Sequence, residues 1–150
     1  MFKRFFQTSA SSVGLILRLT LGLIMLPHGL QMVFGWFGGS GLSQTVTMFT
    51  QYEHIPLILA VIGALTPLVA SIVLILGLCG RLMAILIGIF LAVAMLTVHL
   101  PVGFFMNWTG QLPGEGYEFH LLGIGIVLAL IITGSGRYSL DRHLTQKQAA

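Results

Sequence analysis

An apolar stretch from about residue 13 to residue 34 most constrains how this chain can fold. About 20 helical residues cross a hydrocarbon core about 30 Å thick, so the stretch is long enough to span a bilayer. It nevertheless contains Arg18 and His28. An ionisable side chain within a span is costly, and it usually faces a protein interior or a polar path. The stretch therefore predicts an integral membrane protein in which Arg18 and His28 are candidate site residues.

Composition indicates the same class of protein. Hydrophobic residues make up 56% of the chain and charged residues 7%, and the mean hydropathy is +0.98. We expect one domain over residues 1–150, held together by helices that pack in the lipid bilayer. The net charge of +3 does not predict nucleic-acid binding, because the basic residues are scattered. The single cysteine, Cys79, excludes an internal disulfide and a Cys-x-x-Cys pair; at a helix end, we expect it to be inert.

Three further apolar stretches follow, at about residues 55–79, 82–100 and 119–134. The first stretch is longer than a typical signal-peptide core and is not followed by a small-residue cleavage pattern, so we interpret it as an uncleaved span. Gly80 and Arg81 alone separate the second and third stretches, which predicts a tight hairpin. We expect an all-α membrane protein, a bundle of four transmembrane helices.

The basic residues predict the orientation of this bundle. In a four-span arrangement, one side receives Lys3, Arg4, Arg81, Arg137, Arg142 and Lys147. The opposite loops contain Glu53, His54 and Glu115 but no Lys or Arg. Cytoplasmic loops of membrane proteins are enriched in Lys and Arg, so we expect both the N and C termini to be cytoplasmic.

The two outer loops differ in character. Residues 36–54 carry Leu42, Val46 and Phe49 at helical spacing, which predicts a short amphipathic helix on the outer surface. Residues 101–117 are rich in Gly and Pro, with aromatic anchors, and are typical of an irregular loop.

Small residues at helical spacing predict where the helices pack against one another. One predicted packing face consists of Gly14, Arg18, Gly22 and Gly29. In the fourth span, the predicted face consists of Glu118, Leu122, Gly125, Ala129 and Thr133.

Four polar residues from three spans share one depth, the outer third of the membrane. They are His28, Gln31, His99 and Glu118. We expect them to converge in a small polar pocket that handles protons. His120 lies about 200° around an ideal helix from Glu118, so both cannot face the pocket unless the helix begins after Glu118.

Each of these residues has a simpler interpretation. Arg18 lies near the cytoplasmic end and can extend to the headgroups instead of an interior partner. Glu118 can serve only to complement the dipole of its helix. His28, Gln31 and His99 can be hydrogen-bonded interior groups without chemistry. Two isolated histidines without motif spacing do not indicate a metal or haem site, and we predict no metal.

Several short motifs together resemble the DoxX family of membrane proteins. The quoted segments are Arg18-x-x-x-Gly22, Pro27-His28-Gly29-x-Gln31, Phe34-Gly35-Trp36-Phe37-Gly38-Gly39, Gly77-Leu78-x-x-Arg81, His99 with Gly103-Phe104-Phe105, Gly116-Tyr117-Glu118-Phe119, and Thr133-Gly134-x-Gly136-Arg137-Tyr138-Ser139-Leu140-Asp141. The resemblance covers nearly the whole chain. It implies a four-helix, multi-pass protein of the bacterial inner membrane.

The resemblance also implies a redox context. Related DoxD-type subunits belong to thiosulfate:quinone oxidoreductases. The resemblance therefore allows quinone as a cofactor and an oxidoreductase subunit as a partner, while the sequence itself leaves the cofactor unknown. An acidic residue common in the outer half of the family's second span is missing here, and Thr66-Pro67 stands about where it would fall. This difference puts the family's proton or substrate handling in question for this chain.

Three functional hypotheses remain open. The leading one is a redox-linked, quinone-associated oxidoreductase component with a His- and Glu-lined pocket. The second is a non-enzymatic accessory or assembly subunit that docks a partner oxidoreductase through its loops. The third is a small transporter, which would require a homo-oligomer to enclose a path.

Overall fold

The computed structural model describes Thr8 and residues 10–147 of the chain, and this part is helical without strands. Lys3 and Arg4, used above to predict the orientation, lie outside the described residues. The helices are α2 (Ser12–Phe34), η1 (Trp36–Gly38), α3 (Gly41–Gln51), α4 (Leu57–Leu76), α5 (Gly80–Ala94), the π-helix η2 (Met95–His99), α6 (Glu118–Thr133) and α7 (Leu140–Lys147).

Three of these helical segments are long and apolar enough to cross a membrane. They are α2, with mean hydropathy 1.7, α4, with 2.7, and the continuous segment Gly80–His99, with 2.5. The apolar helix α6 has 16 residues, a length of about 24 Å. The predicted helical stretches are therefore present, with α6 shorter than the other three.

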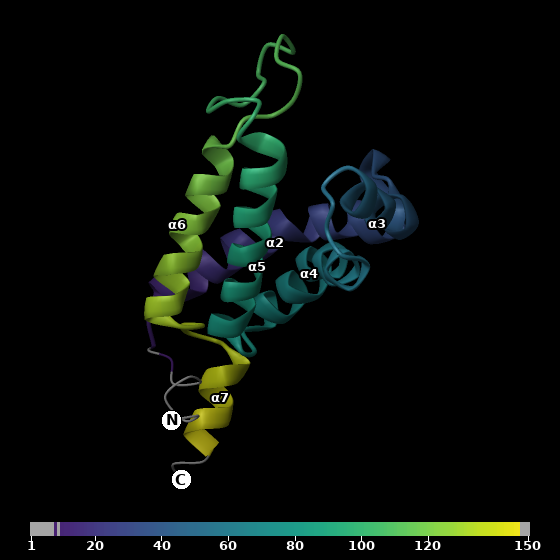
Figure 1. Ribbon diagram of the computed structural model, residues 1–150. Helices are drawn as coiled ribbons and strands as arrows, with labels where there is room; N and C mark the ends of the chain where they lie inside the picture. Colours follow the sequence, from purple (N-terminus) through teal and green to yellow (C-terminus); the bar gives the residue numbers. More distant parts are fainter. Residues whose placement is uncertain (1–7, 9, 148–150) are drawn as a thin grey trace.

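The helices form two hairpins that diverge. α2 packs against α4, and α5 packs against α6. Figure 1 shows α5 and α6 side by side, with α2 passing behind them and α4 leading away from α5 toward α3. We call the end with α3 and the residue 100–117 loop the outer end, and the end with the α4–α5 turn and α7 the inner end.

Glycine allows the close contact between α2 and α4. A Cβ atom built on Gly29 would lie 2.4 Å from the Cα atom of Leu68, much closer than a van der Waals contact. Gly14, Arg18, Gly22 and Gly29 are all buried. The packing face predicted for the first span is thus confirmed, and Gly29 is the position with the least space.

The packing face predicted for the fourth span is wrong. The buried residues of α6 are Gly123, Val127 and Leu130, whereas Leu122 is 67% exposed. Val127 and Leu130 join a core cluster with Leu91 and Ile87 of α5. Helix packing here follows the bulky apolar contacts rather than the row of small residues, so the face that carries Glu118 is turned outward.

The α4–α5 turn lies slightly earlier than predicted. α4 ends at Leu76, and α5 already begins at Gly80, so the turn comprises residues 77–79 instead of Gly80 and Arg81. Gly77 has φ 70° and Cys79 φ 49°. These two left-handed residues, one on each side of Leu78, reverse the chain within three residues. Residue propensities alone do not locate such a turn.

The first outer connection contains the short helix that the sequence predicts. α3 packs on both α2 and α4, and Thr45 is its buried residue. The Thr45 hydroxyl donates a hydrogen bond to the carbonyl of Met32 at 3.2 Å. This bond fixes α3 against the outer end of α2.

Candidate functional site

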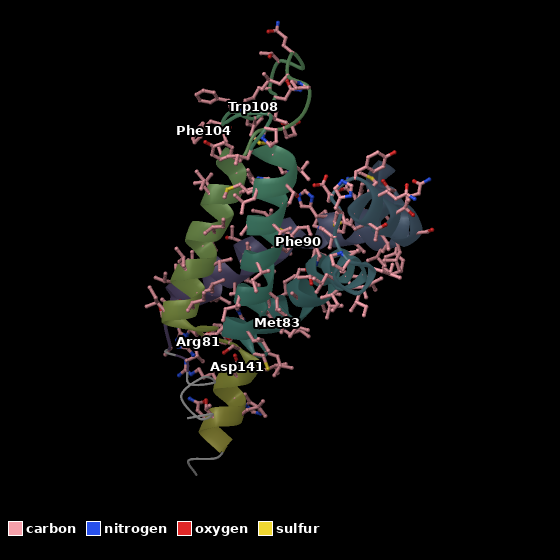
Figure 2. The ribbon with its side chains drawn as sticks, viewed as in Figure 1. Arg81, Met83, Phe90, Phe104, Trp108 and Asp141 are labelled. Carbon is pink, nitrogen blue, oxygen red and sulfur yellow. The ribbon has the colours of Figure 1, made fainter. Side chains whose placement is uncertain are left out.

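A cavity of about 250 Å³ lies between α2, α5, α6 and the residue 100–117 loop. Its lining is mostly apolar, with three histidines: Met25, His28, Met32, Phe90, Leu91, Ala94, His99, Met106, Glu115, Phe119 and His120. Figure 2 shows Phe90 on the side of α5 that faces the α2–α4 hairpin. The cavity is therefore in the wedge where the two hairpins diverge.

His99 and His120 form the closest pair in this cavity. Their ring centroids lie 4.1 Å apart, with the ring planes inclined at 40°. His99 ends the π-helix Met95–His99, a wider turn that is often found at functional sites. Nδ1 of His99 lies 2.8 Å from the carbonyl oxygen of Glu115. A neutral His99 donates from Nδ1 to that carbonyl, which leaves Nε2 as an acceptor.

His120 has an unused polar atom. Its Nδ1 is buried, and within the described part of the chain it has no hydrogen-bond partner. Burying a polar nitrogen without a partner is unfavourable, so such an atom in a cavity calls for a ligand or water. Sequence reasoning left His120 out of the pocket. The available signal was its spacing of three residues from Gly123 and seven from Val127, the buried face of α6.

Two predicted pocket residues lie elsewhere. Nε2 of Gln31 donates to the carbonyl of Phe37 at 3.4 Å, at the turn that follows α2. Oε1 of Glu118 accepts from the backbone N–H of Met106 at 3.0 Å, which ties the loop to the start of α6. The structure thus brings His28 and His99 together with His120, while Gln31 and Glu118 hold the surrounding loops.

Arg18 lies in the interior of the inner end. Its side chain is 3% exposed, and Nη2 donates to the carbonyl of Tyr138 at 2.8 Å and to that of Arg137 at 3.4 Å. Nε and Nη1 are buried without a partner among the described residues. A Cβ atom on Gly77 would overlap the Arg18 guanidinium. Arg18 therefore fastens the segment after α6 to α2, at the opposite end from the histidines.

Asp141 is a second buried charge at this end, 3% exposed. Its carboxylate accepts from the backbone N–H groups of Cys79 at 2.8 Å and Gly80 at 3.0 Å and from the Ser135 hydroxyl. Figure 2 shows Asp141 beside the α4–α5 turn, where α7 begins. Asp141 therefore satisfies N–H groups at the start of α5.

Cys79 is held in the same turn. Burial, and then the nearby Asp141 carboxylate, raise the pKa of the Cys79 thiol above its ordinary value. A raised pKa keeps the sulfur protonated, and the thiol is a much weaker nucleophile than the thiolate. This environment agrees with the expectation of an inert cysteine.

Comparison with known protein families gives two matches. The DoxX profile matches residues 13–100, and a profile described as TQO small subunit DoxD matches residues 68–150. Each match covers more than half of the chain. The chain belongs to the DoxX family. Comparison with curated proteins and with solved structures gave no match.

The two family matches overlap and cover different residues of the two ends of this DoxX-family chain. The DoxX match includes Arg18, His28 and His99, and the DoxD match includes His99, His120 and Asp141. Both families comprise membrane proteins, and the DoxD family is described as the TQO small subunit. The family resemblance read from the sequence motifs is therefore confirmed.

Thr66 and Pro67 stand where the family resemblance predicts an acidic residue. The Thr66 hydroxyl donates to the carbonyl of Ile62 at 2.7 Å, within α4, and Pro67 is buried. Neither residue lines the histidine cavity. Over Thr8 and residues 10–147, no group of three or more His, Cys, Asp or Glu side chains is arranged to hold a metal ion.

Proposed function

We propose that this DoxX-family chain is the quinone-associated component of a membrane redox complex, and that the cavity of His28, His99 and His120 receives the quinone ring. The observation that carries the proposal is the unpartnered Nδ1 of His120 inside a mostly apolar cavity. A cavity of about 150 Å³ holds benzene. The 250 Å³ found here has room for one substituted six-membered ring, with its apolar tail outside in lipid.

The histidine pair supplies the chemistry that a quinone ring requires. Conversion of a quinone to a quinol consumes two electrons and two protons. Nδ1 of His120, when protonated, donates a hydrogen bond to a ring carbonyl. This hydrogen bond becomes stronger as negative charge develops on the carbonyl oxygen. His99 lies beside it, with the two ring centroids 4.1 Å apart, where its imidazole can act as the second proton-transfer group. With one cysteine in the chain, a thiol pair cannot supply the electrons, so they come from a partner oxidoreductase.

The proposal includes four spans, with both termini in the cytoplasm of a bacterium and the outer end outside its inner membrane. α6 is short, but it packs along α5, whose Gly80–His99 segment is long enough to span. Arg81, Arg137 and Arg142 lie at the inner end, and the outer loops contain no Lys or Arg. This one-sided distribution supports the orientation.

A second candidate function is an accessory subunit that docks its partner through the outer loops. The observation that favours it is the exposure of aromatic side chains there: Trp108 is 85% exposed and Phe105 69%. Figure 2 shows Trp108 and Phe104 on the loop that extends beyond α5 and α6. Large exposed aromatic residues are typical of interfaces with proteins or headgroups.

An activity assay separates the two functions. The protein, purified with its co-purifying partners, is mixed with candidate sulfur donors and a short-chain quinone, and quinol formation is followed optically. The quinone function predicts that His99→Ala and His120→Ala abolish turnover while the complex still assembles. The accessory function predicts a different result. Turnover then survives in the histidine variants, whereas Trp108→Ala loses both the bound partner and the turnover.

A further inference from the structure

A second cleft, of about 540 Å³, lies at the inner end, remote from the histidine cavity. Its lining residues are Ala10, Arg137, Tyr138, Ser139, Arg142, His143 and Gln146. Two guanidinium groups and an imidazole therefore surround one hollow between the start of α2 and α7. The proposed quinone chemistry uses none of these side chains.

No acidic side chain is available to neutralise this cleft. The whole chain has four acidic residues, and three of them, Glu53, Glu115 and Glu118, belong to the outer end. The fourth, Asp141, is buried, and its carboxylate accepts hydrogen bonds from the α4–α5 turn and Ser135. The guanidinium of Arg137 lies over the Tyr138 ring, 5.3 Å from its centroid. The cleft is thus a concave surface of uncompensated positive charge.

The backbone that carries these cations is held in place. Buried Arg18 donates to the carbonyls of Arg137 and Tyr138. The Ser139 hydroxyl accepts from the N–H of Arg142 at 3.2 Å and donates to the carbonyl of Gly136 at 2.8 Å. A fixed backbone lowers the entropy lost when a ligand binds, so the cleft is preorganised for an anion.

The position of the cleft at the membrane edge indicates which kind of anion it binds. Arg137 follows the end of α6 at Thr133 by four residues, which places it at the edge of the membrane if α6 spans the bilayer. Tyr138 is 76% exposed, and Leu140 and Leu144, one turn apart on α7, are 42% and 49% exposed. An exposed tyrosine beside basic and apolar side chains is typical of the headgroup region.

We propose that this cleft is a binding site for the phosphate of an anionic phospholipid, with Arg137 and Arg142 contacting the phosphate oxygens. Guanidinium groups match phosphate geometry and bind it with two parallel hydrogen bonds. The inference does not depend on quinone binding, because it concerns the opposite end of the molecule.

Native mass spectrometry of the delipidated full-length protein tests the site. The protein is titrated with phosphatidylglycerol or with phosphatidylcholine of the same acyl chains, and the bound lipid is counted. We expect a preference for phosphatidylglycerol that falls about 30-fold in the Arg137→Gln/Arg142→Gln double variant. Each basic residue near the membrane surface contributes roughly 1 kcal/mol, and a change of about 1.4 kcal/mol corresponds to a tenfold change in affinity. The matched Arg137→Lys/Arg142→Lys variant keeps the charge but not the paired guanidinium hydrogen bonds, so its preference should lie between those of the wild type and the glutamine variant.

Three results would overturn the proposal. One is equal binding of the two lipids by the wild-type protein. Another is an unchanged preference in the glutamine variant, with its thermal midpoint used to verify that it is folded. The third comes from a parallel titration with inorganic phosphate: saturable binding as tight as that of the lipid would assign the cleft to a free phosphate instead.

Discussion

The ring centroids of His99 and His120 lie 4.1 Å apart. This contact connects the π-helix at the end of α5 to the first turn of α6. Each ring has a different hydrogen-bonding state: His99 is bound to the Glu115 carbonyl, and Nδ1 of His120 is unpartnered among the described residues. The hairpin is thus closed at its outer end by two polar rings in an apolar setting. This pair is the centre of the proposed quinone site.

Replacing Gly29 tests the contact between α2 and α4. Gly29→Ala places a Cβ atom 2.4 Å from Leu68 backbone atoms, and the helices must separate. Overpacking of this kind costs about 1–3 kcal/mol, so we expect a lower thermal midpoint in detergent and less folded protein. Gly125→Ala is the matched control, because a Cβ atom there has nothing within 4 Å. Equal midpoints for the two variants would contradict the packing described.

Removing the Asp141 carboxylate tests the cap on α5. Asp141→Ala leaves the buried N–H groups of Cys79 and Gly80 without an acceptor, at about 1–3 kcal/mol for each unsatisfied group. We expect denaturant titration in detergent to show a loss of about 2–4 kcal/mol in the free energy of unfolding. Glu53→Ala, which removes an acid from the outer end, should change the stability by less than about 0.5 kcal/mol.

The contribution of Arg18 to the stability of the fold is predicted to depend on Asp141. The two charges attract each other through the inner end, and removing Arg18 leaves the Asp141 carboxylate buried without its cation. Arg18→Leu should therefore cost about 3 kcal/mol, despite making α2 more apolar, whereas Thr20→Leu on the exposed face should not. In the Arg18→Leu/Asp141→Asn double variant, the loss should be smaller than the sum of the single losses. Strictly additive losses would show that Arg18 and Asp141 are not coupled, and wild-type stability of Arg18→Leu would show that the interior contacts of Arg18 do not stabilise the fold.

The helices were predictable from the sequence because long apolar runs have few other solutions in lipid. The apolar stretch at residues 13–34 corresponds to α2 within one residue at its start. The site was harder to predict, because depth along a helix is readable from sequence but rotation about its axis is not. Glu118 and His120 share a depth, and only the packing of Val127 and Leu130 against α5 decides which of the two faces inward.

The contacts of Arg18 were also beyond sequence reasoning. Its partners, the carbonyls of Arg137 and Tyr138, lie about 120 positions later in the chain. Backbone carbonyls carry no residue-type signal. The π-helix that orients His99 has no such signal either, since its sequence, MLTVH, is compatible with an ordinary α-helix.

Reporter fusions test the proposed orientation. Fusions after Gln51 and after Gly110 should report an outside location, and fusions after Arg81 and at Ala150 a cytoplasmic one, because Lys and Arg are excluded from the outer loops. An alkaline phosphatase and a green fluorescent protein reporter at each site give opposite signals and serve as mutual controls. A cytoplasmic location for Gly110 would mean that the chain does not cross the membrane four times.

The most direct test of the quinone site is the affinity of the purified protein for a short-chain quinone, measured by isothermal titration calorimetry in detergent. His120→Phe replaces the unpartnered Nδ1 with carbon at similar ring size, and losing one hydrogen bond weakens binding by about tenfold. His143→Phe at the exposed inner end is the control and should bind like the wild type. The proposed quinone site predicts saturable wild-type binding that weakens in His120→Phe alone. Identical affinities in all three proteins, or no saturable binding by the wild type, would contradict it.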